Sequence, residues 1–149
     1  MKILLLLLAI AVVLLIGLRL LFGHFIMGSQ ALVVNDKLQA CPESPNCHAI
    51  SIEFTDTNDG IFLIEQLHDS ARAMTGSDVI EKTDNYLHVS YTSAVFGFKD
   101  DLECLIETTG EETITLHCRS ASRVGYSDFD MNRKRIDKLL SEANIRQPS

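Results

Sequence analysis

The chain has 149 residues, of which 46% are hydrophobic, and a formal net charge of −7. An apolar leader of about 27 residues carries Lys2 and Arg19 but no acidic residue, so the remainder holds 11 basic against 20 acidic side chains, a formal −9. This balance repels polyphosphate and argues against a nucleic-acid partner, and the length beyond the leader suffices for one hydrophobic core.

The leader predicts a membrane helix. Residues 3–18 are sixteen consecutive residues without a charge, and a helix over residues 3–22 would be about 30 Å long, the thickness of the hydrocarbon core. We therefore expect residues 1–27 to be a retained transmembrane anchor, residues 28–39 a linker, and residues 40–149 a single domain. A cleaved secretory signal is the alternative, because Lys2 provides a positive start and Gly28-Ser29-Gln30 supplies small residues after the apolar run.

Beyond the linker, the pattern predicts a small α+β domain. A short strand is expected at 49–54, and apolar residues at helical spacing predict a helix at 60–74 that ends at Thr75-Gly76-Ser77. Four further strands are expected at 79–82, 86–92, 101–108 and 113–119, and a final helix at 129–143. The order β, α, four β, α predicts an antiparallel sheet with two helices packed on one face, and in strand 86–92 the alternation predicts one buried face and one wetter face.

Four cysteines bear on the compartment. Cys41 and Cys47 close a turn-rich loop with two prolines, so we expect them to form a disulfide in an oxidising environment. If residues 110–112 form a three-residue hairpin loop, Cys104 lies directly opposite Cys118 on the apolar face of two paired strands. A cross-strand disulfide and two packed free thiols are both compatible with that placement.

The densest polar stretch, residues 119–128, leads into the final helix. Ser127 or Asp128 is expected to cap that helix, since its oxygen can accept from the free amides of the first turn. The same amides, with nearby arginines, favour an anionic group such as phosphate or carboxylate. The candidate binding residues are Arg119, Ser122, Arg123, Ser127, Asp128, Asn132 and Arg133.

Asn132 falls on an apolar stripe of the final helix that includes Phe129 and Ile136 and should face the sheet. Because a buried amide needs hydrogen-bond partners, we expect Asn132 to tie the 119–128 loop to the helix. A role in an active site is the alternative.

In the segment 96–101, Phe-Gly-Phe-Lys-Asp-Asp, two aromatic residues flank a glycine and are followed by two adjacent carboxylates. Asp100 and Asp101 should point to opposite faces of a strand, which makes them a poor acid–base pair. Core packing is the favoured role for Phe96 and Phe98, and contact with a partner or lipid is the alternative. The histidines show no metal-ligand spacing, although His88 and His117 could share the wetter face in a weak metal site.

Three separated motifs together resemble the domain-of-unknown-function family 1499. They are the cysteine loop 41–47, the segment 96–101, and the stretch 119–128 with Asn132-Arg133-Lys134-Arg135. The resemblance covers about residues 38–142 and implies a bacterial or plastid α+β domain that often follows a membrane or export segment. It implies no particular reaction. Where members often carry small residues after the second cysteine, this chain has His48-Ala49-Ile50.

The sequence thus favours a non-enzymatic envelope domain, attached to the cytoplasmic membrane by a single span and facing the periplasm. We expect it to bind an envelope protein or a small anionic ligand near residues 119–135, with neither cofactor nor metal. The alternatives are a small envelope enzyme that acts on lipid or cell-wall anionic material through the same segment, and a soluble protein exported after cleavage of the leader.

Overall fold

The computed structural model describes residues 2–25, 33–34, 36–55, 60–110 and 113–145. Its helices are α1 (Lys2–Phe25), α2 (Gly60–Ala73) and α3 (Met131–Glu142). Its strands are β1 (Val33–Val34), β2 (Lys37–Leu38), β3 (Cys47–Phe54), β4 (Ser77–Lys82), β5 (Tyr86–Thr92), β6 (Lys99–Thr108) and β7 (Ile114–Ser122). The predicted α+β class is confirmed, and each expected strand and helix of the domain is present within a few residues of its expected limits.

Five strands form one antiparallel sheet in the order β3-β7-β6-β5-β4. The β6–β7 pair has the expected hairpin register, because Thr108 pairs with Ile114 and Cys104 with Cys118. The expected Cys41–Cys47 disulfide is confirmed, and Cys104 and Cys118, which the sequence left open between a disulfide and two free thiols, are also joined in a disulfide. The second bond therefore joins neighbouring strands in the middle of the sheet.

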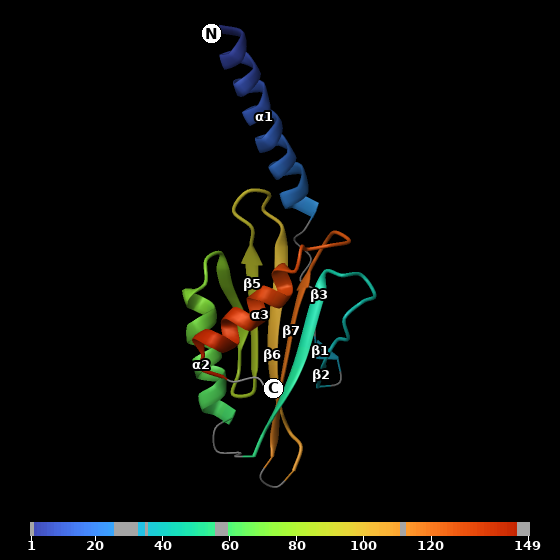
Figure 1. Ribbon diagram of the computed structural model, residues 1–149, viewed down its shortest axis with the longest axis vertical. Helices are drawn as coiled ribbons and strands as arrows, with labels where there is room; N and C mark the ends of the chain where they lie inside the picture. Colours follow the sequence, from blue (N-terminus) through green and yellow to red (C-terminus); the bar gives the residue numbers. More distant parts are fainter. Residues whose placement is uncertain (1, 26–32, 35, 56–59, 111–112, 146–149) are drawn as a thin grey trace.

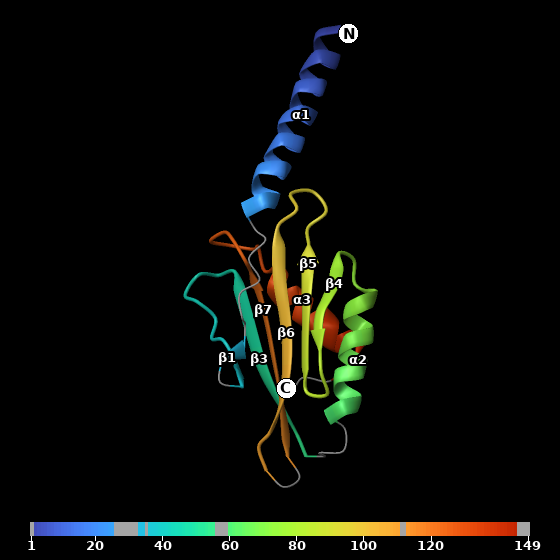
Figure 2. The same ribbon diagram turned by 180° about the vertical axis from the view of Figure 1, so that it is seen from behind.

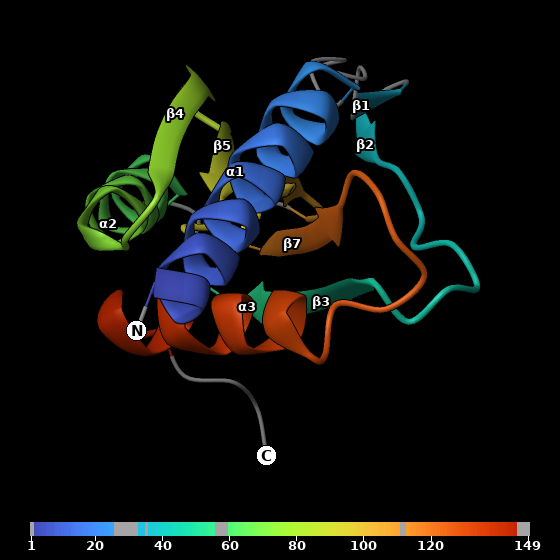
Figure 3. The same ribbon diagram turned by 90° about the horizontal axis from the view of Figure 1, so that it is seen from above.

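Helices α2 and α3 cover the same face of the sheet, as Figure 1 shows from the front and Figure 3 from above. Alternate residues of β5, β6 and β7 point into this layer together with the apolar stripes of both helices. The fully buried side chains at its centre include Leu67, Leu87, Leu102, Leu116, Ile136 and Leu139. The predicted packing of two helices on one face is confirmed.

Gly76 closes the turn between α2 and β4 and fixes where this edge of the sheet begins. Its φ of +82° is one that side chains rarely adopt, and a Cβ there would meet the backbone oxygen of Thr92 at 2.6 Å. The close approach lets the amide of Thr92 donate to the carbonyl of Gly76 at 2.9 Å. The helix end that the sequence predicted at Thr75-Gly76-Ser77 is thus held against the end of β5.

The opposite face of the sheet, seen in Figure 2, differs from the sequence expectation. Tyr86, His88 and Ser90 were expected on the wetter side of β5, yet all three are buried. Charged side chains from β6 and β7 pack over them, and β2 contacts β6. The strands β1 and β2 pair with each other inside the segment 28–39, which we expected to be a linker.

Helix α1 begins at Lys2, and its apolar side chains from Ile3 to Ile16 are largely exposed. We expected a transmembrane helix within residues 1–27. Across the ranges that the structure describes, no helix meets the combination of length and hydropathy expected of a membrane span.

Candidate functional site

Two buried carboxylates of β6 each hold an arginine on the face away from the helices. Glu103 accepts hydrogen bonds from Tyr86 Oη and from Arg119 Nη1, both at 3.1 Å. The Glu103 side chain has no exposed surface, and that of Arg119 is 8% exposed. Burial raises the pKa of Glu103 and outweighs the bond from Tyr86 and the charge of Arg119, which both lower it.

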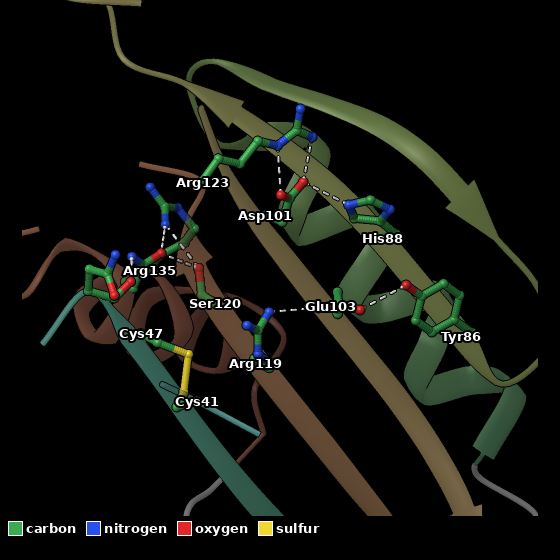
Figure 4. Close-up of polar contacts among 12 residues, drawn as sticks. Cys41, Cys47, Tyr86, His88, Asp101, Glu103, Arg119, Ser120, Arg123 and Arg135 are labelled. Carbon is green, nitrogen blue, oxygen red and sulfur yellow. Dashed lines mark hydrogen bonds and ion pairs between the residues drawn. A yellow bond between two sulfur atoms is a disulfide. The ribbon is translucent and has the colours of Figure 1, made fainter. Parts of the chain in front are cut away.

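Asp101 forms the second group, shown beside the first in Figure 4. Arg123 donates hydrogen bonds to its two oxygens from Nε and Nη2, both at 2.7 Å, and His88 Nε2 donates to Oδ1 at 2.9 Å. Burial would raise the pKa of Asp101, but the hydrogen bonds and charges of Arg123 and His88 outweigh it and lower the pKa from 3.8 to about 2. Arg123 is therefore matched by a buried carboxylate of its own sheet.

This lowered pKa predicts acid sensitivity. A carboxyl group whose pKa is lower in the folded state contributes stability above its unfolded pKa, and the contribution is lost as the pH falls from about 4 towards 2. Asp101→Asn should cost about 2 kcal/mol of unfolding free energy at pH 7, and the difference from the wild type should disappear near pH 2. Urea unfolding across this pH range measures both effects. Asp78→Asn, at an exposed position of β4, is the control, and a constant difference for Asp101→Asn would contradict the prediction.

Asn132 organises the helix side of β7. Its carbonyl oxygen accepts from Ser120 Oγ at 2.6 Å and also from Arg135 Nη1, and its amide donates to Ser122 Oγ at 3.0 Å. The same amide donates to the backbone oxygen of Asn46 at 2.9 Å. The expected tie between the final helix and the segment that precedes it is confirmed, and it extends to the end of the cysteine loop.

The start of α3 differs from the expectation in position. The helix begins at Met131, and its N-cap is Asp130, which has a left-handed φ of 64° and makes no side-chain capping bond. Asp128 nevertheless accepts from the amides of Asp130 at 3.0 Å and Asn132 at 2.8 Å, so its carboxylate serves the first turn as expected. Ser127 Oγ accepts from the amide of Phe129 at 3.4 Å.

Phe129 was expected on the buried stripe of the final helix, and this prediction is wrong. Its φ of 55° places it before the helix begins, so the helical spacing does not apply to it. Its side chain is 85% exposed. Phe96 and Phe98 are also not core residues, because they are 48% and 41% exposed and their rings stack on each other with centroids 5.6 Å apart.

An open hollow of about 1210 Å³, lined mainly by apolar surface, lies at the end of the sheet where these aromatic residues gather. Its walls come from the end of α2, the adjoining ends of β5, β6 and β7, the β5–β6 loop, the β7–α3 loop, and α3 as far as Lys138. Among the apolar side chains are Met74, Phe96, Phe98, Val124, Phe129 and Met131. We call this hollow the apolar groove.

Few charged side chains enter the apolar groove. Asp100 and Arg135 lie at its base, where Arg135 Nη2 and Asp100 Oδ2 are 2.6 Å apart and the guanidinium sits 4.7 Å from the ring centroid of Tyr91. Burial raises the pKa of Tyr91 to about 12. Lys134 and Lys138 extend from the exposed side of α3 at the rim. Asp128 also lines the groove, so its charged lining is three basic against two acidic side chains, while its walls are mainly apolar.

The seven candidate binding residues are divided among different surroundings. Ser122, Ser127 and Asp128 line the apolar groove. Arg119 and Arg123 contact carboxylates on the other face of the sheet, and Asn132 is buried between α3 and β7. Arg133 is exposed on α3, with Nη2 at 3.7 Å from Asp130. The structure therefore places three of the seven residues in the apolar groove. Arg119 and Arg123 lie away from these three.

Asp100 and Asp101 point to opposite faces of the sheet, as the strand alternation predicted. They form ion pairs with Arg135 and Arg123 respectively. His88 and His117 take separate partners, since His117 Nδ1 lies 2.8 Å from Ser51 Oγ. Sequence reasoning did not find the apolar groove as a site. Its one local signal was the pair Phe96 and Phe98, whose contact with a partner or lipid was the less favoured interpretation.

The fold and these contacts define a small α+β domain with one helix-covered face, one face of buried ion pairs and an apolar groove at the sheet end. A family model described as "Protein of unknown function (DUF1499)" matches residues 37–142, and the chain belongs to this family. The search of curated proteins finds no match. Among solved structures, the chain is similar to CalU16 from Micromonospora echinospora, with 10% identity, a TM-score of 0.37, and coverage of 66% of this chain and 87% of the other.

Proposed function

We propose that this protein is a membrane-tethered, non-enzymatic binding domain that faces the periplasm and holds the acyl chain of an anionic lipid in the apolar groove. The observation that carries the proposal is the groove itself. Its volume of about 1210 Å³ exceeds the roughly 300–1,000 Å³ typical of sites for compact small molecules, so it has room for a long chain.

The charges at the rim favour an anionic head group. Lys134 and Lys138 lie on the exposed side of α3, where Lys138 Nζ is 3.6 Å from Oε1 of the exposed Glu142, although the domain as a whole is acidic. Arg135, deeper in the groove, already contacts Asp100 and Asn132 and serves as part of the wall. A carboxylate or phosphate at the rim would meet the two lysines while its apolar chain lies against Phe98 and Val124.

The polar groups in the groove favour binding over catalysis. The carboxylate of Asp100 is held by Arg135. The raised pKa of Tyr91, about 12, keeps its hydroxyl protonated near neutral pH. Asp100 is thus already engaged within the protein, and Tyr91 keeps its proton.

The tether and the compartment rest on two further observations. The run from residue 3 to residue 18 has no charge, and an apolar helix of this composition is most stable when lipid surrounds it. All four cysteines are paired, and structural disulfides persist in oxidising compartments such as the periplasm.

Binding of a fluorescent hexadecanoic acid to the full-length protein tests the proposal. Val124→Glu places a charge on an exposed apolar wall of the groove and should weaken binding about tenfold or more. Ile61→Glu, at an exposed apolar position of α2 outside the groove, is the matched control and should bind as the wild type does.

The rim is tested by combining Lys134→Ala with Lys138→Ala. This double variant should bind the fluorescent acid more weakly and the corresponding alcohol unchanged, because the alcohol carries no charge for the lysines to contact. Equal binding of the acid by the wild type and Val124→Glu would refute the proposed site.

A further inference from the structure

The apolar groove opens between two loops that expose an unusual amount of apolar side chain. These end loops are residues 93–98, between β5 and β6, and residues 123–130, between β7 and α3. Their exposed large apolar residues are Val95, Phe96, Phe98, Val124, Tyr126 and Phe129. Val95 and Tyr126 do not line the groove, so the two loops expose apolar side chains outside it as well. Large apolar side chains gathered in exposed loops are typical of a contact with a partner or a membrane.

Hydrogen bonds fix the backbone conformation of the end loops, whose apolar side chains are exposed. In the first loop, the amide of Gly97 donates to the Ser93 carbonyl at 3.0 Å and the amide of Phe98 to Ser93 Oγ at 2.9 Å. Gly97 has a φ of +70°, a conformation that favours glycine. In the second loop, Asn46 Nδ2 donates to the carbonyl of Gly125 at 2.6 Å.

Basic side chains stand beside this apolar surface. Arg133 and Lys134 are exposed in the first turns of α3, and Lys138, whose Nζ is 3.6 Å from Glu142 Oε1, follows one turn later. Asp128 and Asp130 lie in the adjacent loop, where Asp128 is engaged by two backbone amides and Asp130 faces Arg133. Aromatic residues next to exposed cations are the combination that binds at the interface of an anionic bilayer.

The position of α1 indicates which end of the domain would face a bilayer that holds this helix. In Figures 1 and 2, α1 extends from the end of the domain at which the β5–β6 loop lies, and the start of α2 lies at the other end. If α1 is held in lipid, as the proposed function requires, the end loops face that same bilayer. Seven residues separate α1 from β1, and an extended chain spans at most about 3.6 Å per residue. The start of β1 therefore lies within about 30 Å of the end of α1, which keeps the domain close to the bilayer.

We infer that the end loops dock on the surface of the bilayer, with their aromatic side chains in the interface and the basic residues of α3 against anionic head groups. This inference rests on the proposed tether. Docking places the mouth of the apolar groove against lipid, so its ligand enters directly from the bilayer without crossing water.

The protein contains no tryptophan, which allows a single introduced indole to report contact with lipid. Tyr126→Trp places the probe on an end loop outside the groove, and Phe62→Trp places it at an exposed position in the first turn of α2 as the control. The full-length variants are reconstituted into vesicles of phosphatidylglycerol and phosphatidylcholine with brominated acyl chains. We expect quenching and a blue shift for Tyr126→Trp and neither for Phe62→Trp.

Phe98→Trp, inside the groove, separates this inference from the proposed function. Quenching at residue 98 without quenching at residue 126, in protein that floats with the vesicles, would overturn docking and leave lipid binding in the groove intact. Failure of the wild type to float with vesicles would overturn the tether and docking together. A blue shift of Tyr126→Trp that needs no lipid and grows with protein concentration would assign the surface to a second copy of the chain and also overturn docking.

Discussion

Replacing Glu103 with alanine should lower the free energy of unfolding by about 3–5 kcal/mol, the cost of breaking a buried ion pair from one side. The variant leaves the guanidinium of Arg119, which is almost fully buried, without its carboxylate, and it removes the acceptor of the Tyr86 hydroxyl. Both groups are at least nine-tenths buried, so water can replace little of the lost carboxylate. Chemical denaturation at neutral pH measures the loss.

Glu107→Ala is the matched control, because Glu107 lies on the same strand and face but its side chain is 41% exposed and faces His117, whose side chain is 30% exposed. Its loss should cost less than about 1 kcal/mol. If the two variants unfold at the same denaturant concentration, the ion pair at Glu103 does not stabilise the fold. Replacing Glu103 and Arg119 together by apolar residues of similar volume should recover much of the lost stability.

Asn132→Ala should cost about 3 kcal/mol or more. The amide is completely buried and joins Ser120, Ser122 and the backbone of Asn46, so truncation leaves several buried polar atoms without partners at about 1–3 kcal/mol each. The bonds connect α3, β7 and the residue before Cys47 in one step. We therefore expect the loss in thermal and in chemical unfolding alike.

Two variants sharpen this test. Asn132→Asp keeps the oxygen that accepts from Ser120 but removes the donor to Asn46, so it should also be destabilised. Arg133→Ala changes the neighbouring, exposed residue of α3 and should leave stability within about 0.5 kcal/mol of the wild type. Wild-type stability of Asn132→Ala would show that the polar cluster is dispensable.

The sheet was predictable because its strands are joined by short turns and alternate cleanly. The turn around Gly110 fixed which residues of β6 and β7 face each other, and from that alone Cys104 was placed opposite Cys118. The state of the two sulfurs was not predictable, since a pair of packed thiols would show the same alternation. The helices followed equally from apolar spacing.

The buried second face was not predictable for a physical reason. Asp101 and Glu103 read as solvent-facing in a strand, and their burial depends on partners 16 and 22 residues away on β7 and beyond its end. A sequence pattern classes a charged residue as solvent-facing because of its polarity. The pattern contains no information on which partner charge will contact that residue in the fold. For the same reason, Arg119 and Arg123 were grouped as candidate anion ligands, although each of them contacts a carboxylate in the fold.

The apolar groove escaped sequence reasoning because no single segment forms it. Its walls come from segments as distant in sequence as Met74 and Lys138, and each contributes a few residues that look unremarkable alone. Phe129 was misplaced for a local reason, namely that the chain turns through a left-handed conformation before α3 begins. Three of the polar residues singled out from the sequence nevertheless lie on the groove.

The strand order has a consequence for biogenesis. Strand β3 is the first of the sheet along the chain, yet it pairs with β7, the last, so that Cys47 stands opposite Ala121. While the polypeptide is still emerging from the ribosome, β3 has no complement within the five-stranded sheet. The sheet can close only once nearly all of the domain has been synthesised, so its folding depends on a contact between the two ends of the domain sequence and not on pairing of neighbours alone.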